Sequence, residues 1–200
     1  LFTAVTTPIP AQERERLGTV RFTTPCAAAV QPRFDRAVAL LHSFALDASV
    51  AAFTDVATAD PACGMAWWGV AMSWLGNPLA GPPNARGLKE GGAAVANAKA
   101  AGAKTDRERD YIAAIEIFYK DADRVDHRTR ALAYERAMEQ IAAKYPADRE
   151  AAVFYALALN ITLDPNDKTY ANQLKAAAFL ERASAEQPDH PGIGHYLIHS

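Results

Sequence analysis

Three of the five histidines of this chain, His190, His195 and His199, lie in its last stretch, PDHPGIGHYLIHS. If a helix begins at Pro191, His195 and His199 are one turn apart and present their imidazoles on one face. A transition metal such as zinc, copper or iron accepts two ligands in this geometry. Tightly held zinc takes three or four ligands, so we expect His190, or His42 through the fold, to contribute. The alternative is that these rings hydrogen-bond to neighbouring helices as packing residues.

Other signatures of catalysis are missing from the sequence. It contains no nucleophile-elbow pattern, no phosphate-binding glycine loop and no His-Glu-x-x-His. The formal charge of -2 predicts no nucleic-acid partner and no anionic-membrane partner. No apolar run reaches the ~20 residues that cross a bilayer, so we expect no transmembrane segment. Nothing in the chain requires an enzyme, but a histidine-based metal site at the C-terminal end would suit a metal-dependent enzyme as well as a metal-binding protein.

The composition favours an all-helical protein. Half of the residues are apolar, 44 are alanine, and alternating β-branched runs are almost absent. Apolar residues recur at helical spacing between clusters of proline, glycine and aspartate. The pattern predicts about nine helices, at 30–46, 48–59, 63–76, 86–101, 106–121, 127–144, 148–162, 169–186 and from 191 onward.

Several helix starts carry capping residues. Thr105 with Glu108 forms a capping-box pattern, Asp126 precedes another helix, and Pro191 suits a first helical turn. Residues 1–25 show no strong period, so they predict an irregular N-terminal arm ahead of a single helical domain over 26–200. The small, polar start LFTAVTTPIPAQ favours a mature exported chain, periplasmic or secreted, and the alternative is a cytoplasmic protein.

Three segments share one pattern that ends in proline: SVAAFTDVATADP, YERAMEQIAAKYP and AAAFLERASAEQP. Another helix follows each proline, the first of them ACGMAWWGVAMSWL. This pattern resembles the tetratricopeptide repeat, a helix-turn-helix unit of about 34 residues. These stretches, together with HPGIGHYLIHS, also resemble the sequences of a group of uncharacterised bacterial tetratricopeptide-like proteins. The resemblance implies a right-handed α-solenoid of helical hairpins, in a chain that continues beyond Ser200.

In that family the first helix of each unit lines a concave groove. Carried over by position, the resemblance places ten residues there: Phe34, Val38, Leu41, His42, Met65, Trp68, Met72, Leu75, Leu157 and Asn160. The expected groove is apolar and aromatic, and it would bind a protein or peptide partner. Two alternatives remain: these side chains are simply buried by other helices or by the N-terminal arm, or the chain is a structural subunit of a larger assembly.

The repeat arrangement that the resemblance implies also predicts how close Cys26 and Cys63 lie. First helices of adjacent repeats run roughly parallel, so the N-terminal ends that carry these cysteines can come within disulfide range. The alternative is two separate thiols, each packed as a small hydrophobic group.

Overall fold

The computed structural model describes residues 17–164 and 166–200. Residues 1–16 of the predicted N-terminal arm, including the stretch that favours export, lie outside the described residues. A single 3-10 turn, η1 (Ala28–Val30), precedes the α-helices. The helices of the described part are α1 (Gln31–His42), α2 (Leu46–Ala59), α3 (Gly64–Trp74), α4 (Ala85–Ala101), α5 (Asp106–Tyr119), α6 (His127–Lys144), α7 (Arg149–Ile161), α8 (Ala171–Glu186) and α9 (Ile193–Ile198).

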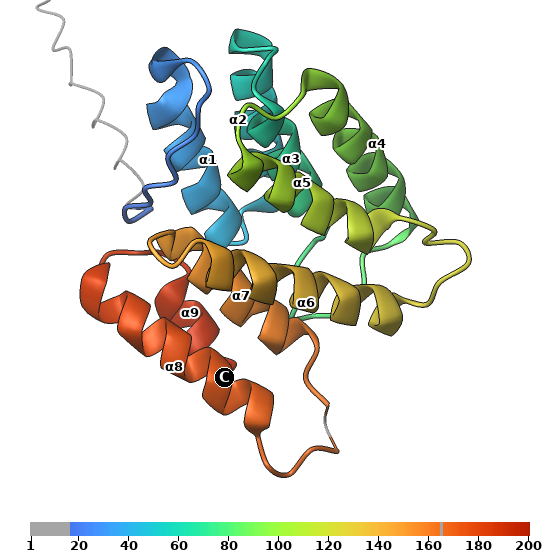
Figure 1. Cartoon of the computed structure of the whole chain (residues 1–200), viewed down its shortest axis with the longest axis vertical. Coiled ribbons are helices and arrows are strands. Elements are labelled where there is room, and N and C mark those ends of the chain that lie inside the picture. The colour runs from blue at the N-terminus through green and yellow to red at the C-terminus, as the bar shows by residue number, and fades with distance from the viewer. Residues whose placement is uncertain (1–16, 165) are drawn as a thin grey trace, which may run out of the picture.

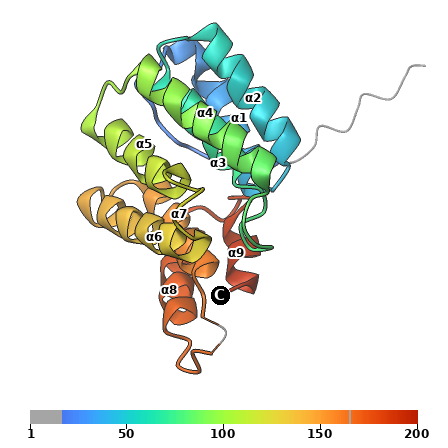
Figure 2. The same cartoon turned by 90° about the vertical axis from the view of Figure 1, so that its right-hand side faces the viewer.

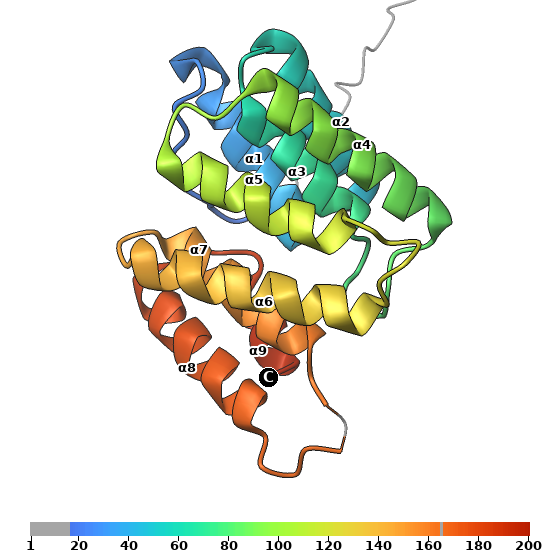
Figure 3. The ribbon, with the colours of Figure 1, turned by 45° about the vertical axis from the view of Figure 1, so that its right-hand side comes forward.

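Each α-helix packs against the next along the chain, from α1 to α9 (Figure 1). Further contacts join α1 to α3, α3 to α5 and α7 to α9, as in an array in which alternate helices form an inner row. Figures 2 and 3 show α1 to α5 gathered on one side of the molecule and α6 to α9 on the other. The prediction of an all-α, solenoid-like array of neighbouring helices is confirmed.

The predicted helix bounds agree with the structure to within a few residues, with two informative exceptions. The first helix ends at His42 rather than at residue 46, because Phe44 adopts a left-handed backbone with φ of 54°. The last helix begins at Ile193 rather than at Pro191, because His190 and Gly192 form a turn ahead of it. Both turns lie next to the cluster described below.

Side-chain caps begin the helices where the sequence indicates them. The capping box of Thr105 and Glu108 is present at α5, and Asp126 accepts a hydrogen bond from the Thr129 amide at α6. Asp148 caps α7 by accepting a hydrogen bond from the Ala151 amide. This cap fixes where α7 begins, and so fixes the position of Glu150 in its first turn.

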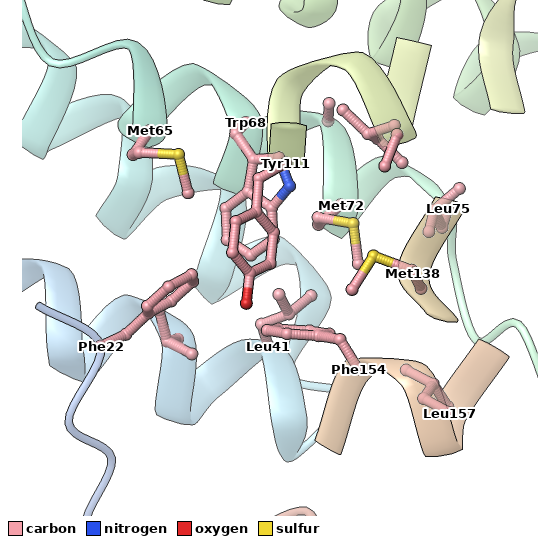
Figure 4. Packing of buried hydrophobic residues seen from close by; sticks show 14 of the residues in the cluster. Phe22, Leu41, Met65, Trp68, Met72, Leu75, Tyr111, Met138, Phe154 and Leu157 are labelled. Atoms are coloured by element: carbon pink, nitrogen blue, oxygen red, sulfur yellow. The ribbon is translucent and has the colours of Figure 1, made fainter. Parts of the chain in front are cut away.

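Aromatic rings from distant parts of the chain meet in one core (Figure 4). The Trp68 ring of α3 lies 5.4 Å from Phe22, 5.5 Å from Tyr111 and 5.3 Å from Phe154, measured between ring centroids. These partners come from the N-terminal segment, α5 and α7. The core therefore joins both groups of helices into one body.

A disulfide joins Cys26 to Cys63, with an S–S distance of 1.99 Å. It fixes the segment that leads into η1 to the N-cap of α3. The bond closes a loop of 37 residues, which the chain-entropy estimate values at about 3–4 kcal/mol. In the part of the chain that the structure describes, every helix is too short or too polar to cross a membrane.

Candidate functional site

The ten residues predicted to line an open groove are all buried in the core. Phe34, Val38, Met65 and His42 are fully enclosed, and the most exposed of the ten, Leu41, reaches only 6%. The other five are Trp68, Met72, Leu75, Leu157 and Asn160, and they lie in the same interior. These side chains are packing residues, and the expected apolar groove is filled.

The reason is that other parts of the protein cover this face. Phe22, from the irregular N-terminal segment, packs edge-on against Phe34 at 5.7 Å between ring centroids. Tyr111 and Phe154 close the other sides around Trp68. Asn160 donates a hydrogen bond to the Tyr196 carbonyl at 3.1 Å, so its amide holds α9.

The predicted histidine trio is divided between two places. His195 is half-buried with its ring edge-on to Phe44, and His199 is exposed. Their ring centroids lie 5.3 Å apart, so the pair is adjacent as expected. Among the described residues, no group of three or more histidine, cysteine or carboxylate donors includes this pair.

His190 instead meets His42 and Glu150 in the interior, and we call these three residues the buried cluster. Glu150 Oε2 lies 2.8 Å from His42 Nε2, and Glu150 Oε1 lies 3.1 Å from His190 Nε2. The side chains of all three are fully enclosed. One donor atom from each residue lies within 4.8 Å of the other two.

Three separate segments position the buried cluster. His42 is the last residue of α1, and its ring stacks on Phe154 with centroids 4.7 Å apart. Glu150 follows the Asp148 cap and Arg149 in the first turn of α7. His190 lies in the turn before α9, where a Cβ on Gly192 would come within 3.0 Å of His42. The missing side chain at Gly192 lets this turn approach α1.

Hydrogen bonds fix the proton positions in the buried cluster. The Gly192 amide donates to His190 Nδ1 at 3.1 Å, so His190 carries its proton on Nε2 and donates it to Glu150. His42 Nδ1 lies 2.9 Å from Tyr196 Oη. The Tyr196 hydroxyl donates there, because His42 Nε2–H donates to the carboxylate. Every polar atom of the cluster then has a partner.

Burial sets the charges of the cluster. It lowers the pKa of His42 below 6.5, although Glu150 opposes the shift, so the imidazole is neutral at pH 7. Burial alone would raise the pKa of Glu150, but the two adjacent imidazoles outweigh it and hold this pKa at about 2. Burial also raises the pKa of Tyr196 well above 10.0, which keeps the phenol protonated. The cluster therefore holds the ionised Glu150 carboxylate against the neutral His42 imidazole.

We expect the ion-free protein, in chelator, to lose stability in two steps as the pH falls. In the unfolded chain His42 takes up a proton near pH 6.5, whereas in the folded chain its lowered pKa keeps it neutral. Because protons then favour the unfolded state, the free energy of unfolding declines below that pH. Glu150 adds a second loss between its unfolded pKa of 4.5 and its folded pKa of about 2. Urea unfolding across this pH range measures both. Glu150→Gln should make the second step smaller, and other carboxylates with a lowered pKa, such as Asp110, account for what remains of it. An unchanged slope below pH 4.5 in Glu150→Gln would contradict the assignment.

Sequence reasoning missed Glu150, although one signal for it was present. Glu150 precedes Val153, Phe154 and Leu157 by three, four and seven positions, which is the spacing of one helix face. A glutamate on the apolar face of a helix indicates a buried carboxylate that needs partners.

Comparisons of the chain with protein-family models, curated proteins and solved structures find no match. Function is therefore inferred from the geometry of the site.

Proposed function

We propose that this protein binds a divalent transition-metal ion, such as zinc, through His42, Glu150 and His190. The observation that carries the proposal is the convergence of two imidazole nitrogens and one carboxylate from three separate segments. Tetrahedral ligands about 2.0–2.2 Å from one ion lie about 3.3–3.6 Å from each other. The nitrogen–oxygen distances of 2.8 and 3.1 Å in the cluster are hydrogen-bond distances, so the side chains would separate by a few tenths of an ångström to admit an ion.

The charges of the cluster suit a metal ion. Metal ligands must be deprotonated, and metal binding at a protonated site has to expel protons first. His42 is already neutral and Glu150 already ionised, for the reasons given above. A divalent cation would also compensate the negative charge that the cluster holds in the apolar core.

The hydrogen-bond partners of the two Nδ1 atoms, Tyr196 Oη and the Gly192 amide, determine the free-energy cost of metal binding. With a metal on His42 Nε2, the ring donates from Nδ1 to Tyr196 Oη, which is a common arrangement behind a ligating histidine. With a metal on His190 Nε2, the proton moves to Nδ1 and opposes the Gly192 amide, so that contact must open. Opening that contact costs about 0.5–1.5 kcal/mol, and metal–ligand bonds would replace the two hydrogen bonds to Glu150. Zinc held by four ligands in zinc-finger peptides contributes about 10–16 kcal/mol, so even a fraction of that free energy exceeds the loss.

The enclosure of the site favours a structural ion over a catalytic one. The side chains of His42, Glu150 and His190 have no exposed surface, so a substrate cannot reach an ion held between them. The ion would tie together α1, α7 and the turn before α9. It would stabilise the array in the way that closed zinc sites stabilise small folds.

Elemental mass spectrometry tests the proposal. Untagged protein, purified without chelator and loaded with zinc sulfate, should retain an equimolar amount of zinc. Glu150→Gln keeps the shape of the side chain but removes the charged ligand. Its affinity should fall by at least the ~10–100-fold that loss of a supporting residue costs. The double variant His195→Ala/His199→Ala should retain zinc, because neither ring belongs to the buried cluster.

Two outcomes would refute the assignment: a wild-type protein that holds no metal after loading, or a folded Glu150→Gln that holds as much as wild type. Circular dichroism establishes that the variant is folded. An NMR readout is also specific, since the Gly192 amide should shift on loading as its contact with His190 opens.

We also propose that the chain is tetratricopeptide-like and resides in an oxidising compartment. The packing of consecutive helices supports a tetratricopeptide-like array. The disulfide between Cys26 and Cys63 supports an oxidising compartment, periplasmic or secreted, because such bonds are rare in reducing cytosol.

A further inference from the structure

A basic cleft lies on the surface near the start of α7, outside the buried cluster. It has a volume of about 800 Å³ and lies between the N-terminal segment, the start of α5 and the connection from α6 to α7. Its charged lining consists of Arg21, Arg107, Lys144, Arg149 and Asp148. Four cations and one carboxylate line the cleft, and two more carboxylates, Asp110 and Glu186, pair with Lys144 and Arg149 at its edge.

One of these cations is part of the wall. Arg107 Nε lies 2.6 Å from Asp148 Oδ2, and a second nitrogen of Arg107 donates to the Thr23 carbonyl at 2.8 Å. The guanidinium also sits over the Phe22 ring, 4.5 Å from its centroid. These contacts neutralise Asp148 and hold the N-terminal segment in place, so they leave three cations facing the cleft.

The remaining three cations are accessible. Arg21 is exposed and makes no ion pair with any described residue. Lys144 pairs with Asp110 at 2.7 Å, and Arg149 pairs with Glu186. The Lys144 and Arg149 side chains are about half exposed. Exposed ion pairs contribute about 0–1 kcal/mol, so a carboxylate brought by a ligand can replace Asp110 or Glu186.

Two smaller cavities share residues with the cleft and lengthen it. One shares Lys144 and runs between α5 and α6, where Ala113, Ile117, Ala137 and Ile141 form an apolar floor. The other shares Arg149 with the cleft and reaches α8. The combined surface is longer than a compact anion needs. Beyond the cleft it is mostly apolar, with Asp110 as the added charge in the first cavity and Arg182 with Glu186 in the second.

We propose that the basic cleft binds an acidic segment of a partner protein, with its carboxylates on Arg21, Lys144 and Arg149. Small apolar side chains of the same segment would lie along the floor between α5 and α6. Charge complementarity selects an acidic ligand, and the elongated apolar floor selects a peptide. Nucleic acid is a poorer match, because the chain as a whole has a net charge of -2.

Fluorescence anisotropy tests this with a short fluorescein-labelled peptide of alanine and glutamate that has a free C-terminal carboxylate. Arg21→Glu and Arg149→Glu should each weaken binding by about tenfold or more, since each loses a charge-assisted hydrogen bond. Lys89→Glu is the matched control, because it makes the same change of charge on the exposed surface of α4, outside the cleft. It should leave the affinity within about twofold, because an exposed charge outside the cleft is screened by salt.

Three outcomes would overturn the proposal. The peptide does not bind wild-type protein, or Lys89→Glu weakens binding as much as the cleft variants do. In the third outcome, inorganic phosphate or a single-stranded oligonucleotide displaces the peptide more effectively than a free glutamate peptide does. Because the cleft residues are not metal ligands, the result is independent of the zinc measurement.

Discussion

Replacing Glu150 by leucine should lower the free energy of unfolding by about 3–5 kcal/mol, because it removes one member of a buried, hydrogen-bonded group. Leucine fills much of the space but accepts no hydrogen bond. The Nε2–H groups of His42 and His190 would then be left unpaired where no water reaches them. Urea unfolding of the ion-free variant beside wild type measures the loss.

Two further variants calibrate this result. Glu150→Gln should cost much less, because its oxygen can accept from His190 while its amide donates to His42 in the other tautomer. Glu181→Leu makes the same chemical change at an exposed position of α8, and it should stay within about 0.5 kcal/mol of wild type. If Glu150→Leu is no more harmful than Glu181→Leu, the cluster does not stabilise the fold.

Trp68→Ala should also cost about 3–5 kcal/mol, the range for deleting a large buried aromatic side chain. Its ring contacts Phe22, Tyr111 and Phe154, so the cavity would open between both groups of helices. Chemical denaturation monitored by far-UV circular dichroism gives the value.

The neighbouring Trp67 provides the control for this variant. Trp67 is only partly buried, so Trp67→Ala should be distinctly milder. A Trp68→Ala protein of unchanged stability that fails to bind a partner would instead restore the interpretation of Trp68 as a groove residue.

The helices could be predicted because their signals are local. Apolar spacing and caps such as Thr105 with Glu108 depend on residues within one or two turns, and the structure confirms them. The groove prediction failed for a different reason. Spacing identifies residues that share a face, but it does not show what covers that face. The cover includes Phe22, from a stretch without any period.

The histidine prediction shows the same limit. Sequence proximity grouped His190 with His195 and His199, and one expected alternative, His42, is the partner that the fold brings to His190. The turn at Gly192 directs His190 inward, while α9 carries His195 and His199 toward the surface. A turn of this kind depends on the tertiary contact with α1, which no local pattern contains.

The wide sequence separation within the buried cluster has a consequence for how the chain folds. Helical hairpins such as α1 with α2 and α7 with α8 can form early, because their contacts are local. His42 and Glu150 are 108 positions apart, and Glu150 and His190 a further 40, so their meeting closes long loops and comes after the local hairpins. Capture of an ion would then mark the final docking step, and a nascent chain would remain unable to hold it until His190 has emerged from the ribosome.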